Sequence, residues 1–311
     1  MNGNVIVLTG GVGGAKLVLG LTQVMAPDRI TAIVNTGDDF RHLGLWICPD
    51  LDTLLYTLAG KADAEHGWGR AGETWGFMAA LRSLGAEDWF SLGDGDLALH
   101  VLRTARLAGG ATLSRISRDF ARAWDLPVTM LPMSDDPVST HLSTNEGDLP
   151  FQRYFVDRRC APTVNAIRFE GAAAAQAAPG VVEAIQSADT RAVLIAPSNP
   201  FLSIDPILAV PGIRAALMKA TAPVVAVSPI VGGKAVKGPT AKLMVELGIP
   251  ITPRAIADHY RGVIDGLLVD ERDGLDGVGI PMAAADTLMV SLKDRARVAS
   301  AALALADRIA S

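Results

Sequence analysis

The segment that most constrains the fold is a glycine-rich loop near the N-terminus. A β-branched run, Val5 to Leu8, leads into residues 9–16 (TGGVGGAK), and an apolar, helix-prone segment follows over 17–25. A second β-branched run occupies 30–34. Strand, glycine loop, helix and strand in this order are typical of the first βαβ unit of an α/β protein, which crosses over right-handedly into a parallel sheet. We therefore predict a Rossmann-like, doubly wound, mainly parallel sheet.

Later segments continue the strand pattern and are interrupted by one helical region. Strand-like runs lie at 128–131, 154–156, 164–169, 192–196, 223–227 and 264–269, and a helix is predicted over 293–309. Between about residues 53 and 125, Leu, Ala and Trp recur at helical spacing. We expect a single Rossmann-like domain over 1–311 that carries a mostly helical insertion, or cap, at about 53–125.

Charge and composition exclude several classes of protein. The chain has 28 Lys and Arg against 33 Asp and Glu, a net charge of −5, which argues against a sequence-independent nucleic-acid binder. Its apolar runs, about 5–7 residues long, are too short to cross a membrane, and no signal peptide is recognised. Cys48 and Cys160 form neither a disulfide framework nor a CxxC metal site. These features lead us to expect a cytoplasmic protein.

The glycine loop is a candidate site for a nucleotide or phosphate. Open α/β sheets bind ligands beyond the carboxyl ends of their strands, and a helix N-terminus offers free N–H groups to an anion. The candidate residues are Gly10, Gly11, Gly13, Gly14 and Lys16. The loop matches neither a Walker A motif nor a clean GxGxxG fingerprint, so a tight structural turn remains an equal alternative.

Two acidic loops suggest a metal site. Asp38 and Asp39 follow the strand-like run at 30–34, and Asp50 and Asp52 lie a short distance further on. Clustered carboxylates suit Mg²⁺, which binds through one or two of them and through substrate phosphates. For any single Asp, helix capping is the better explanation. For the whole set beside a phosphate loop, a metal site is favoured.

Three more polar loops follow predicted strands or lie in the helical region. Residues 92–96 (LGDGD) contain Asp94, residues 133–138 (MSDDPV) contain Ser134, Asp135 and Asp136, and residues 197–200 (PSNP) contain Ser198 and Asn199. This many carboxylates together would repel a phosphorylated substrate. We therefore expect some of them to bind a metal ion, a ribose or guanine N–H groups. No GxSxG elbow and no HExxH motif occur, which disfavours an α/β-hydrolase and a zinc protease.

Taken in order, these loops resemble one family along nearly the whole chain. Residues 10–16, 35–39 (NTGDD), 48–53 (CPDLDT), 92–94, 133–138, 197–200 and 286–289 (DTLM) are similar to the 2-phospho-L-lactate transferases of coenzyme F420 biosynthesis. The resemblance implies that a guanosine-diphosphate-activated three-carbon acid transfers its phosphoryl-acid group to the ribityl hydroxyl of the deazaflavin Fo. GMP leaves, Mg²⁺ is required, and the enzyme is a homodimer.

The resemblance also implies roles for particular residues. Asp52 and Asp50 would be catalytic, Asp52 would bind Mg²⁺ together with Asp38 and Asp39, and Asp52, Ser91 and Asp94 would contact Fo. The nucleotide site would comprise Gly10, Gly11, Gly13, Gly14, Lys16, Ser134, Asp135, Asp136, Ser198 and Asn199. Ser91 and Gly95 stand where the family often has basic residues.

Two other functions are considered. The YvcK-like gluconeogenesis factors are nucleotide-sugar-binding regulators without established transferase activity, and they resemble the chain in its glycine and acidic loops. They usually have TDDGGS after the second strand, whereas Asp38 and Asp39 are followed here by Phe40 and Arg41. A nicotinamide-dependent oxidoreductase would need a GxGxxG motif and an acidic residue at the proper distance at the end of the second strand. The sequence has neither, which disfavours this function. The sequence leaves the donor acid open among phospholactate, phosphoenolpyruvate and 3-phosphoglycerate.

Overall fold

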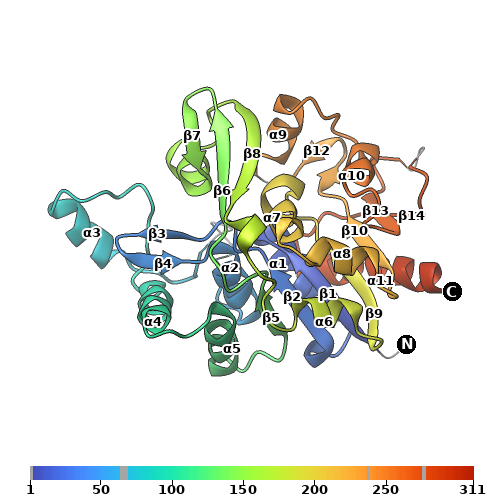
Figure 1. Ribbon diagram of the computed structural model, residues 1–311, viewed down its shortest axis with the longest axis horizontal. Helices are drawn as coiled ribbons and strands as arrows, with labels where there is room; N and C mark the ends of the chain where they lie inside the picture. Colours follow the sequence, from blue (N-terminus) through green and yellow to red (C-terminus); the bar gives the residue numbers. More distant parts are fainter. Residues whose placement is uncertain (1–2, 64–68, 237, 275–277) are drawn as a thin grey trace.

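The centre of the molecule is one seven-stranded sheet in which every strand is parallel to its neighbours (Figure 1). The computed structural model describes residues 3–63, 69–236, 238–274 and 278–311. The strand order is β5-β2-β1-β9-β10-β13-β14. The strands are β1 (Asn4–Thr9), β2 (Ile30–Val34), β5 (Thr129–Pro132), β9 (Thr190–Ile195), β10 (Val224–Val227), β13 (Gly266–Asp270) and β14 (Met282–Ala285). The predicted Rossmann-like α/β sheet is confirmed.

The winding direction of the sheet reverses beside its first strand. Val5 of β1 pairs with Ile30 of β2 on one side and with Ala192 of β9 on the other. The chain builds outward through β2 and β5 on the first side and through β9, β10 and β13 on the second. The carboxyl ends of β1 and β9 therefore flank a topological switch point, where open α/β sheets bind their ligands.

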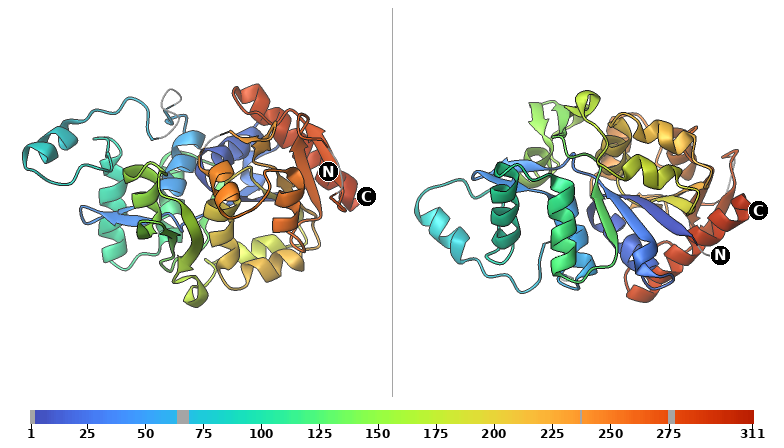
Figure 2. Two further views of the ribbon diagram at one scale, coloured as in Figure 1. Left: turned by 90° about the horizontal axis from the view of Figure 1, so that it is seen from above. Right: turned by 60° about the horizontal axis from the view of Figure 1, so that its bottom comes forward.

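Helices cover both faces of the sheet, which explains why its strands read as unbroken apolar runs. Val5 and Val7 of β1 face one core with α1 (Gly11–Leu21), α2 (Pro49–Leu58), α5 (Leu113–Ala123) and α11 (Leu292–Ala310). Ile6 and Leu8 face the other core. Its helices are α6 (Val181–Gln186), α7 (Asp205–Ala209), α8 (Ile213–Met218), α9 (Thr240–Glu246) and α10 (Pro253–His259). Figure 2 shows α11 and α6–α8 on opposite sides of the sheet.

A smaller unit extends from the β2 side of the sheet. The hairpin of β3 (Phe40–His42) and β4 (Leu45–Ile47), with α3 (Gly76–Ser83), projects away from the sheet, and α4 (Leu97–Ala108) follows (Figure 1). The hairpin and α3 share a separate core around Ile47, Met78 and Leu92. By contrast, α2 and α5 pack against the sheet itself. Only the middle of the predicted helical region therefore stands apart from the main core.

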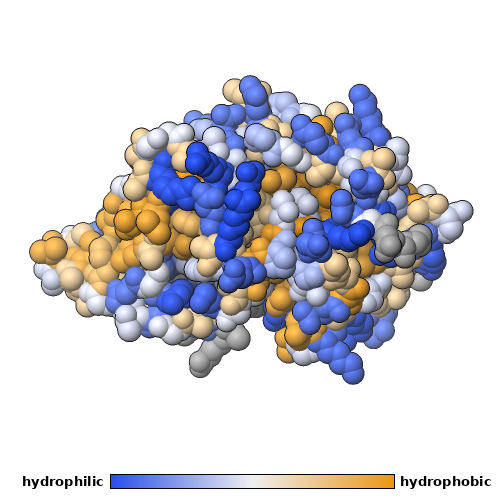
Figure 3. Space-filling model, turned by 90° about the horizontal axis from the view of Figure 1, so that it is seen from below, coloured by the Kyte–Doolittle hydropathy of each residue, from blue (hydrophilic) through white to orange (hydrophobic). Residues whose placement is uncertain are grey.

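The projecting end exposes several large apolar side chains. Trp75, Leu84, Val101 and Leu102 are at least two-fifths exposed, and Figure 3 shows hydrophobic residues gathered at this end. Such a patch on a folded chain is a candidate contact surface. In the described ranges, no helix is long and apolar enough to cross a membrane.

A three-stranded antiparallel sheet lies beside the carboxyl ends of the main strands. It contains β6 (Ser139–Thr144), β7 (Gly147–Pro150) and β8 (Val164–Glu170), so the run at 164–169 is a strand of this sheet and not of the main one. The predicted strand at 154–156 is wrong, because these residues lie in a helical turn, η2 (Arg153–Asp157). Phe151 and Phe155 are four residues apart, as neighbours on a helix are, and their rings stack with centroids 5.2 Å apart.

The remaining elements are short. They are η1 (Pro27–Arg29), η3 (Ala172–Ala174), η4 (Pro200–Ile204), β11 (Ile230–Val231) and β12 (Lys234–Ala235). An alanine-rich stretch at residues 172–178 begins with η3. Ala172, Ala175 and Ala178 are buried in the core, so every third residue of this stretch packs inward.

A buried carboxylate stabilises the β13 end of the sheet. Asp270 is fully buried and accepts hydrogen bonds from Thr287 N at 2.8 Å and from the guanidinium of Arg272 at 2.5 and 2.8 Å. Burial raises its pKa, but these hydrogen bonds outweigh burial and lower it to about 2. A depressed pKa stabilises the folded state above the unfolded pKa of about 4, and this contribution is lost as the pH falls toward 2.

We expect Asp270→Asn to lower the free energy of unfolding by about 2 kcal/mol at pH 7, with the difference shrinking toward pH 2. Urea unfolding across this pH range measures the effect. Asp28→Asn, at an exposed carboxylate, is the control and should change little. Equal stabilities of Asp270→Asn and wild type at pH 7 would contradict the assignment.

Candidate active site

The glycine loop packs tightly against the turn that follows β9. Gly10 N donates to Ser198 Oγ at 3.3 Å, and Ser198 Oγ donates back to Gly10 O at 2.7 Å. A Cβ at Gly13 would lie 2.8 Å from Pro197 O, and one at Gly14 would lie 2.8 Å from Ser198 Oγ. These glycines are therefore required where two loops meet at the switch point, and the predicted residues of both loops come together there.

Gly11 is the first residue of α1, and its surroundings differ from those of the other loop glycines. Its φ is +63°, and a Cβ built there would meet nothing within 4 Å. Its N–H donates to Asp50 Oδ1 at 2.8 Å. The helix N-terminus thus already interacts with one carboxylate, as its dipole favours, and the backbone beside it is open to a ligand.

Two predicted nucleotide residues make contacts within the protein. Lys16 Nζ donates to Met289 O at 2.8 Å, which ties α1 to the segment before α11. Asn199 Oδ1 accepts from Phe201 N and Leu202 N, at 3.0 and 3.2 Å, and so caps η4. The amide Nδ2 of Asn199 is buried and has no hydrogen-bond partner, so this side chain keeps a free donor at the switch point.

Asp50 connects the glycine loop to the end of β2. Its Oδ2 accepts from Asn35 Nδ2 at 3.0 Å, and Asn35 Oδ1 accepts from Gly37 N at 2.8 Å. Burial raises the pKa of Asp50 to about 6, against the opposing effect of its hydrogen bonds from Asn35 and Gly11. The carboxylate of Asp50 therefore fixes the glycine loop relative to the loop that follows β2.

Asp38 and Asp39 are the carboxylates with the least internal compensation. Each is only 6% exposed. Asp38 Oδ1 and both oxygens of Asp39 are buried without a hydrogen-bond partner. Burial raises the pKa of both well above the ordinary range, and the negative charge of Asp50 raises that of Asp38 further. Buried carboxylates of this kind are costly unless a cation or proton accompanies them.

Asp52, expected to bind metal and Fo, is committed to a different partner. Its oxygens accept from both Nη atoms of Arg103, and one of these contacts is 3.1 Å long. Both side chains are almost completely buried. His100 Nδ1 lies 3.7 Å from Asp52 Oδ2. The structure therefore places Asp52 in a buried ion pair with Arg103, which neutralises its charge. Its role toward a metal ion and Fo stays a prediction.

His100 and Arg103, which lie beside Asp52, come from one face of α4, and Asp96 stands at the start of this helix. Asp96, His100 and Arg103 are spaced four and three residues apart, as helix neighbours are. His100 Nε2 lies 3.2 Å from Asp96 Oδ2, and Tyr56 from α2 donates its hydroxyl to Asp96. Sequence reasoning missed Arg103. The spacing of Asp96, His100 and Arg103 on one face of a largely apolar helix is the sequence signal that could have indicated a buried polar cluster.

Asp94 of the LGDGD loop and Ser91 just before it, the two expected Fo contacts here, lie in different surroundings. Asp94 accepts from Gly76 N and Phe77 N, both at 2.9 Å, and from Thr74 Oγ1 at 2.6 Å. It therefore caps α3 and fixes the projecting unit. Ser91 is half-buried. It lies two residues from Trp89, which lines a cavity described below.

The MSDDPV loop likewise makes structural contacts. Asp135 accepts from Ser114 N at 2.6 Å and from Ser114 Oγ at 2.8 Å, at the start of α5. Asp136 Oδ2 accepts from Gln176 N at 2.8 Å, and Ser134 Oγ donates to Gln176 O at 2.6 Å. These three predicted nucleotide residues join the end of β5 to α5 and to the alanine-rich stretch.

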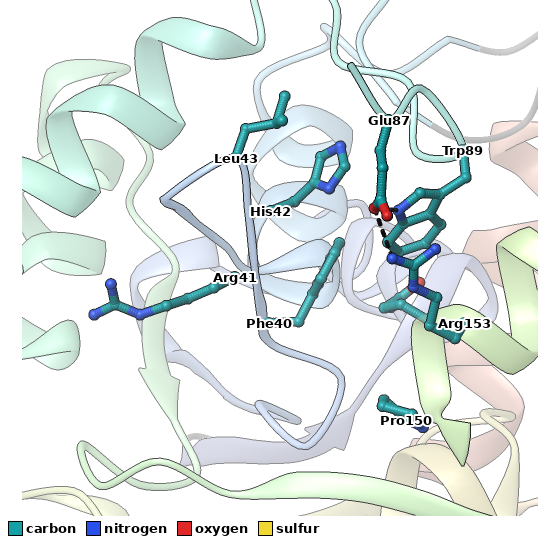
Figure 4. Close-up of a pocket in the computed structure, with 9 residues that line it drawn as sticks. Phe40, Arg41, His42, Leu43, Glu87, Trp89, Pro150 and Arg153 are labelled. Carbon is teal, nitrogen blue, oxygen red and sulfur yellow. Dashed lines mark hydrogen bonds and ion pairs between the residues drawn. The ribbon is translucent and has the colours of Figure 1, made fainter. Parts of the chain in front are cut away.

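Two cavities flank the β3 strand. The larger, of about 390 Å³, is lined by Phe40, His42, Trp89 and Arg153 among others (Figure 4). The smaller, of about 250 Å³, is lined by Thr36, Asp39, Arg41, Trp46, Leu107, Leu113 and residues 135–138. In Figure 4, Arg41 points away from the aromatic side chains of the larger cavity. The unpartnered carboxylate of Asp39 thus borders the smaller cavity.

A preformed metal cage is not seen. Within the described residues, no group of three or more His, Cys, Asp or Glu side chains is arranged to hold a metal ion. The unpartnered oxygens of Asp38 and Asp39 nevertheless suit Mg²⁺, which commonly takes only one or two carboxylates and completes its shell with water and substrate phosphates. The donor set therefore fits an ion that arrives with a phosphorylated ligand.

Comparisons with known proteins agree with this architecture. Residues 5–295 match the family described as 2-phospho-L-lactate transferase CofD. The chain belongs to this family. CofD relatives include proteins named phosphoenolpyruvate transferase from Kitasatospora aureofaciens (43% identical, covering 98% of each chain) and Nocardia farcinica (39% identical, covering 97% of this chain and 94% of the relative).

The fold of this CofD family member also occurs in a solved structure. A UPF0052 family protein from Bacillus halodurans superposes with a TM-score of 0.65 at 19% identity, covering 97% of this chain and 99% of that one. At this identity the likeness shows the fold alone. The protein is a member of a transferase family, and its seven-stranded parallel sheet is the one that the sequence predicted.

Proposed function

We propose that this protein transfers a phosphoenolpyruvate-derived group to the deazaflavin Fo in coenzyme F420 biosynthesis. The donor is the acid activated as a guanosine diphosphate conjugate. The ribityl hydroxyl oxygen bonds to the phosphorus next to the acid, and the bond from that phosphorus to the GMP oxygen breaks. GMP leaves with the electron pair of that bond, and the hydroxyl proton passes to water. The family and the names of its relatives support the reaction class.

The observation that carries the proposal is the group of buried, unpartnered carboxylate oxygens of Asp38 and Asp39 beside the switch point. These two residues would hold Mg²⁺, and the bound ion would neutralise the donor phosphates. A transfer between phosphates and a hydroxyl depends mainly on charge neutralisation and in-line positioning. Desolvated carboxylates facing a phosphate site are suited to that task only with a cation.

The remaining residues of the site position the donor. The open backbone at Gly11 and the free amide of Asn199 offer donors to the guanosine diphosphate moiety at the switch point. Asp50, through Gly11 and Asn35, fixes the glycine loop relative to Asp38 and Asp39. Asp52 acts through Arg103 and α4, and holds the wall of the site in place. The nucleotide roles of Ser134, Asp135 and Asp136 remain predictions.

The proposal makes a product-level prediction. Purified protein is incubated with Fo, Mg²⁺ and a donor in which GMP is joined to phosphoenolpyruvate, phospholactate or 3-phosphoglycerate. The first of these donors should give a coupled product at the highest kcat/KM. Mass spectrometry of the deazaflavin identifies which acid has been attached. No coupled product from any of the three donors would refute the proposal, and a preference for another acid would correct its donor.

The expected homodimer also remains a prediction. The apolar residues exposed at the projecting end, among them Leu84, Val101 and Leu102, support a contact between two copies there.

A further inference from the structure

The smaller cavity beside β3 is lined by an arginine that the described residues leave unpaired. Side chains alternate along a strand, so Arg41 leaves β3 on the face opposite Phe40 and His42, as Figure 4 shows. Its cross-strand partner on β4 is Trp46, and the guanidinium lies over the indole, 5.5 Å from the ring centroid. Among the residues that the structure describes, this guanidinium has neither an ion pair nor a hydrogen bond.

The indole of Trp46 holds the guanidinium of Arg41 beside the cavity. An arginine that lies flat on an aromatic ring keeps its fork of N–H donors free for a carboxylate or a phosphate. The hairpin that carries both residues is fixed to α4, because Trp46 N donates to Thr104 Oγ1 at 2.7 Å and Arg103 donates to Trp46 O at 3.3 Å. The donors of Arg41 are therefore positioned before a ligand arrives.

A buried hydroxyl group supplies a second free donor to the same cavity. Thr36 lines the cavity and is 3% exposed, and its Oγ1 has no hydrogen-bond partner among the described residues. Thr36 belongs to the turn that carries the unpartnered carboxylates, since Asp39 N donates to Thr36 O at 3.2 Å. A buried hydroxyl without a partner is costly, and a ligand oxygen that accepts its hydrogen bond removes this cost.

The carboxylates of Asp135 and Asp136, which also line this cavity, are already engaged. Asp135 accepts from the backbone N and the hydroxyl of Ser114 at the start of α5, and Asp136 accepts from Gln176 N. Asp39 belongs to the proposed Mg²⁺ site. The groups that remain for a ligand are thus the guanidinium, the hydroxyl and a cation site, a set that suits an anionic group.

We propose that the smaller cavity binds the carboxylate of the donor's three-carbon acid, with the Arg41 guanidinium and the Thr36 hydroxyl as its hydrogen-bond donors. The proposal rests on the proposed function, in which the donor phosphates lie beside Asp38 and Asp39. Phosphoenolpyruvate and phospholactate carry their carboxylate on the carbon that bears the phosphate oxygen. Their phosphorus and carboxylate must therefore bind close together, as the carboxylate turn and this cavity allow. Arg41 and Thr36 thereby determine specificity for an acid donor.

The test is equilibrium binding by calorimetry in the presence of Mg²⁺, with Fo absent so that no transfer occurs. The ligands are GDP, the donor in which GMP is joined to phosphoenolpyruvate, and the same donor with a carboxamide in place of the carboxylate. Wild-type protein should bind the carboxylate donor more tightly than the carboxamide by about tenfold or more, the usual effect of hydrogen bonds to a charged group. This preference should disappear in Arg41→Met and return in part in Arg41→Lys. Thr36→Val should weaken binding of the carboxylate donor several-fold.

Controls separate the acid site from the nucleotide site and from a folding defect. Affinity for GDP should be the same in Arg41→Met, Thr36→Val and wild type, because GDP lacks the acid. Arg118→Met, at an exposed arginine of α5 outside the cavity, is the control for losing one positive charge and should keep the wild-type preference.

The outcomes also separate this inference from the proposed function. A wild-type preference in Arg41→Met, or a loss of GDP affinity equal to the loss of donor affinity, would overturn the acid site and leave the transferase proposal intact. Equal wild-type affinities for the carboxylate and carboxamide donors would overturn it as well. Failure of the wild-type protein to bind either donor would overturn both proposals.

Discussion

Asn in place of Asp39 is expected to reduce transfer by about a hundredfold or more, the usual effect of removing one electrostatic contact from a transition state. Both oxygens of Asp39 are buried without hydrogen-bond partners, and burial raises the pKa of this carboxyl despite the opposing effects of Cys48 and Arg103. The substitution therefore removes a carboxylate that the protein compensates only in part. The amide is nearly isosteric and keeps the shape of the loop. Steady-state kinetics with saturating Mg²⁺ measures the loss.

Mg²⁺ binding gives this prediction a second readout. An ion that binds only the folded protein raises the free energy of unfolding with its concentration. Thermal unfolding of the wild type should therefore shift upward with added Mg²⁺, and that of Asp39→Asn should shift much less. Asp148→Asn, at a half-exposed carboxylate on β7, is the control for losing one negative charge. Wild-type transfer and a wild-type Mg²⁺ shift in Asp39→Asn would remove Asp39 from the metal site.

Met in place of Arg103 is expected to destabilise the protein by about 3–5 kcal/mol. The reason is the burial of the pair, because the side chain of Asp52 is only 7% exposed and would keep an uncompensated negative charge. Urea unfolding at pH 7 measures the change. The double variant Arg103→Met/Asp52→Asn should recover part of the loss, since it removes the stranded charge.

A surface ion pair between α4 and α5 provides the matched control. Arg106 pairs with Asp119, and their side chains are 31% and 37% exposed. Arg106→Met should cost less than about 1 kcal/mol, the range for exposed ion pairs. Equal effects at Arg103 and Arg106 would mean that the Asp52 pair is not buried in solution. The same logic predicts that Asp52→Asn impairs folding, and not only transfer, because Arg103 would lose its partner.

The main sheet was predictable because its strands are buried on both faces. Runs such as 5–8, 30–34 and 192–196 are continuously apolar, a pattern that separates them from the amphipathic helices between them. Shorter elements carried no such signal. The β3 and β4 strands have three residues each and were not predicted. The run at 154–156 is β-branched and aromatic in composition, yet burial of Tyr154 in the core favours a helical turn there.

Which loops converge was predictable, but which atoms pair was not. Parallel strands bring their carboxyl ends to one edge, so the glycine loop, the acidic loops and the turn after β9 could be placed together from sequence. The partner of Asp52 could not, because Arg103 is 51 residues away and reaches it only through the packing of α4. The cap that Asp94 forms for α3 likewise depends on a contact 18 residues distant.

The most direct test of the account is whether GMP release is coupled to acceptor conversion. Wild-type protein with Mg²⁺ and the donor in which GMP is joined to phosphoenolpyruvate should release one GMP for each Fo converted, and almost none when Fo is omitted. This stoichiometry, followed by chromatography of nucleotide and deazaflavin in the same sample, requires donor and acceptor sites to act together. Binding of the donor with no GMP released in the presence of Fo would contradict the transferase assignment and favour a nucleotide-binding regulator.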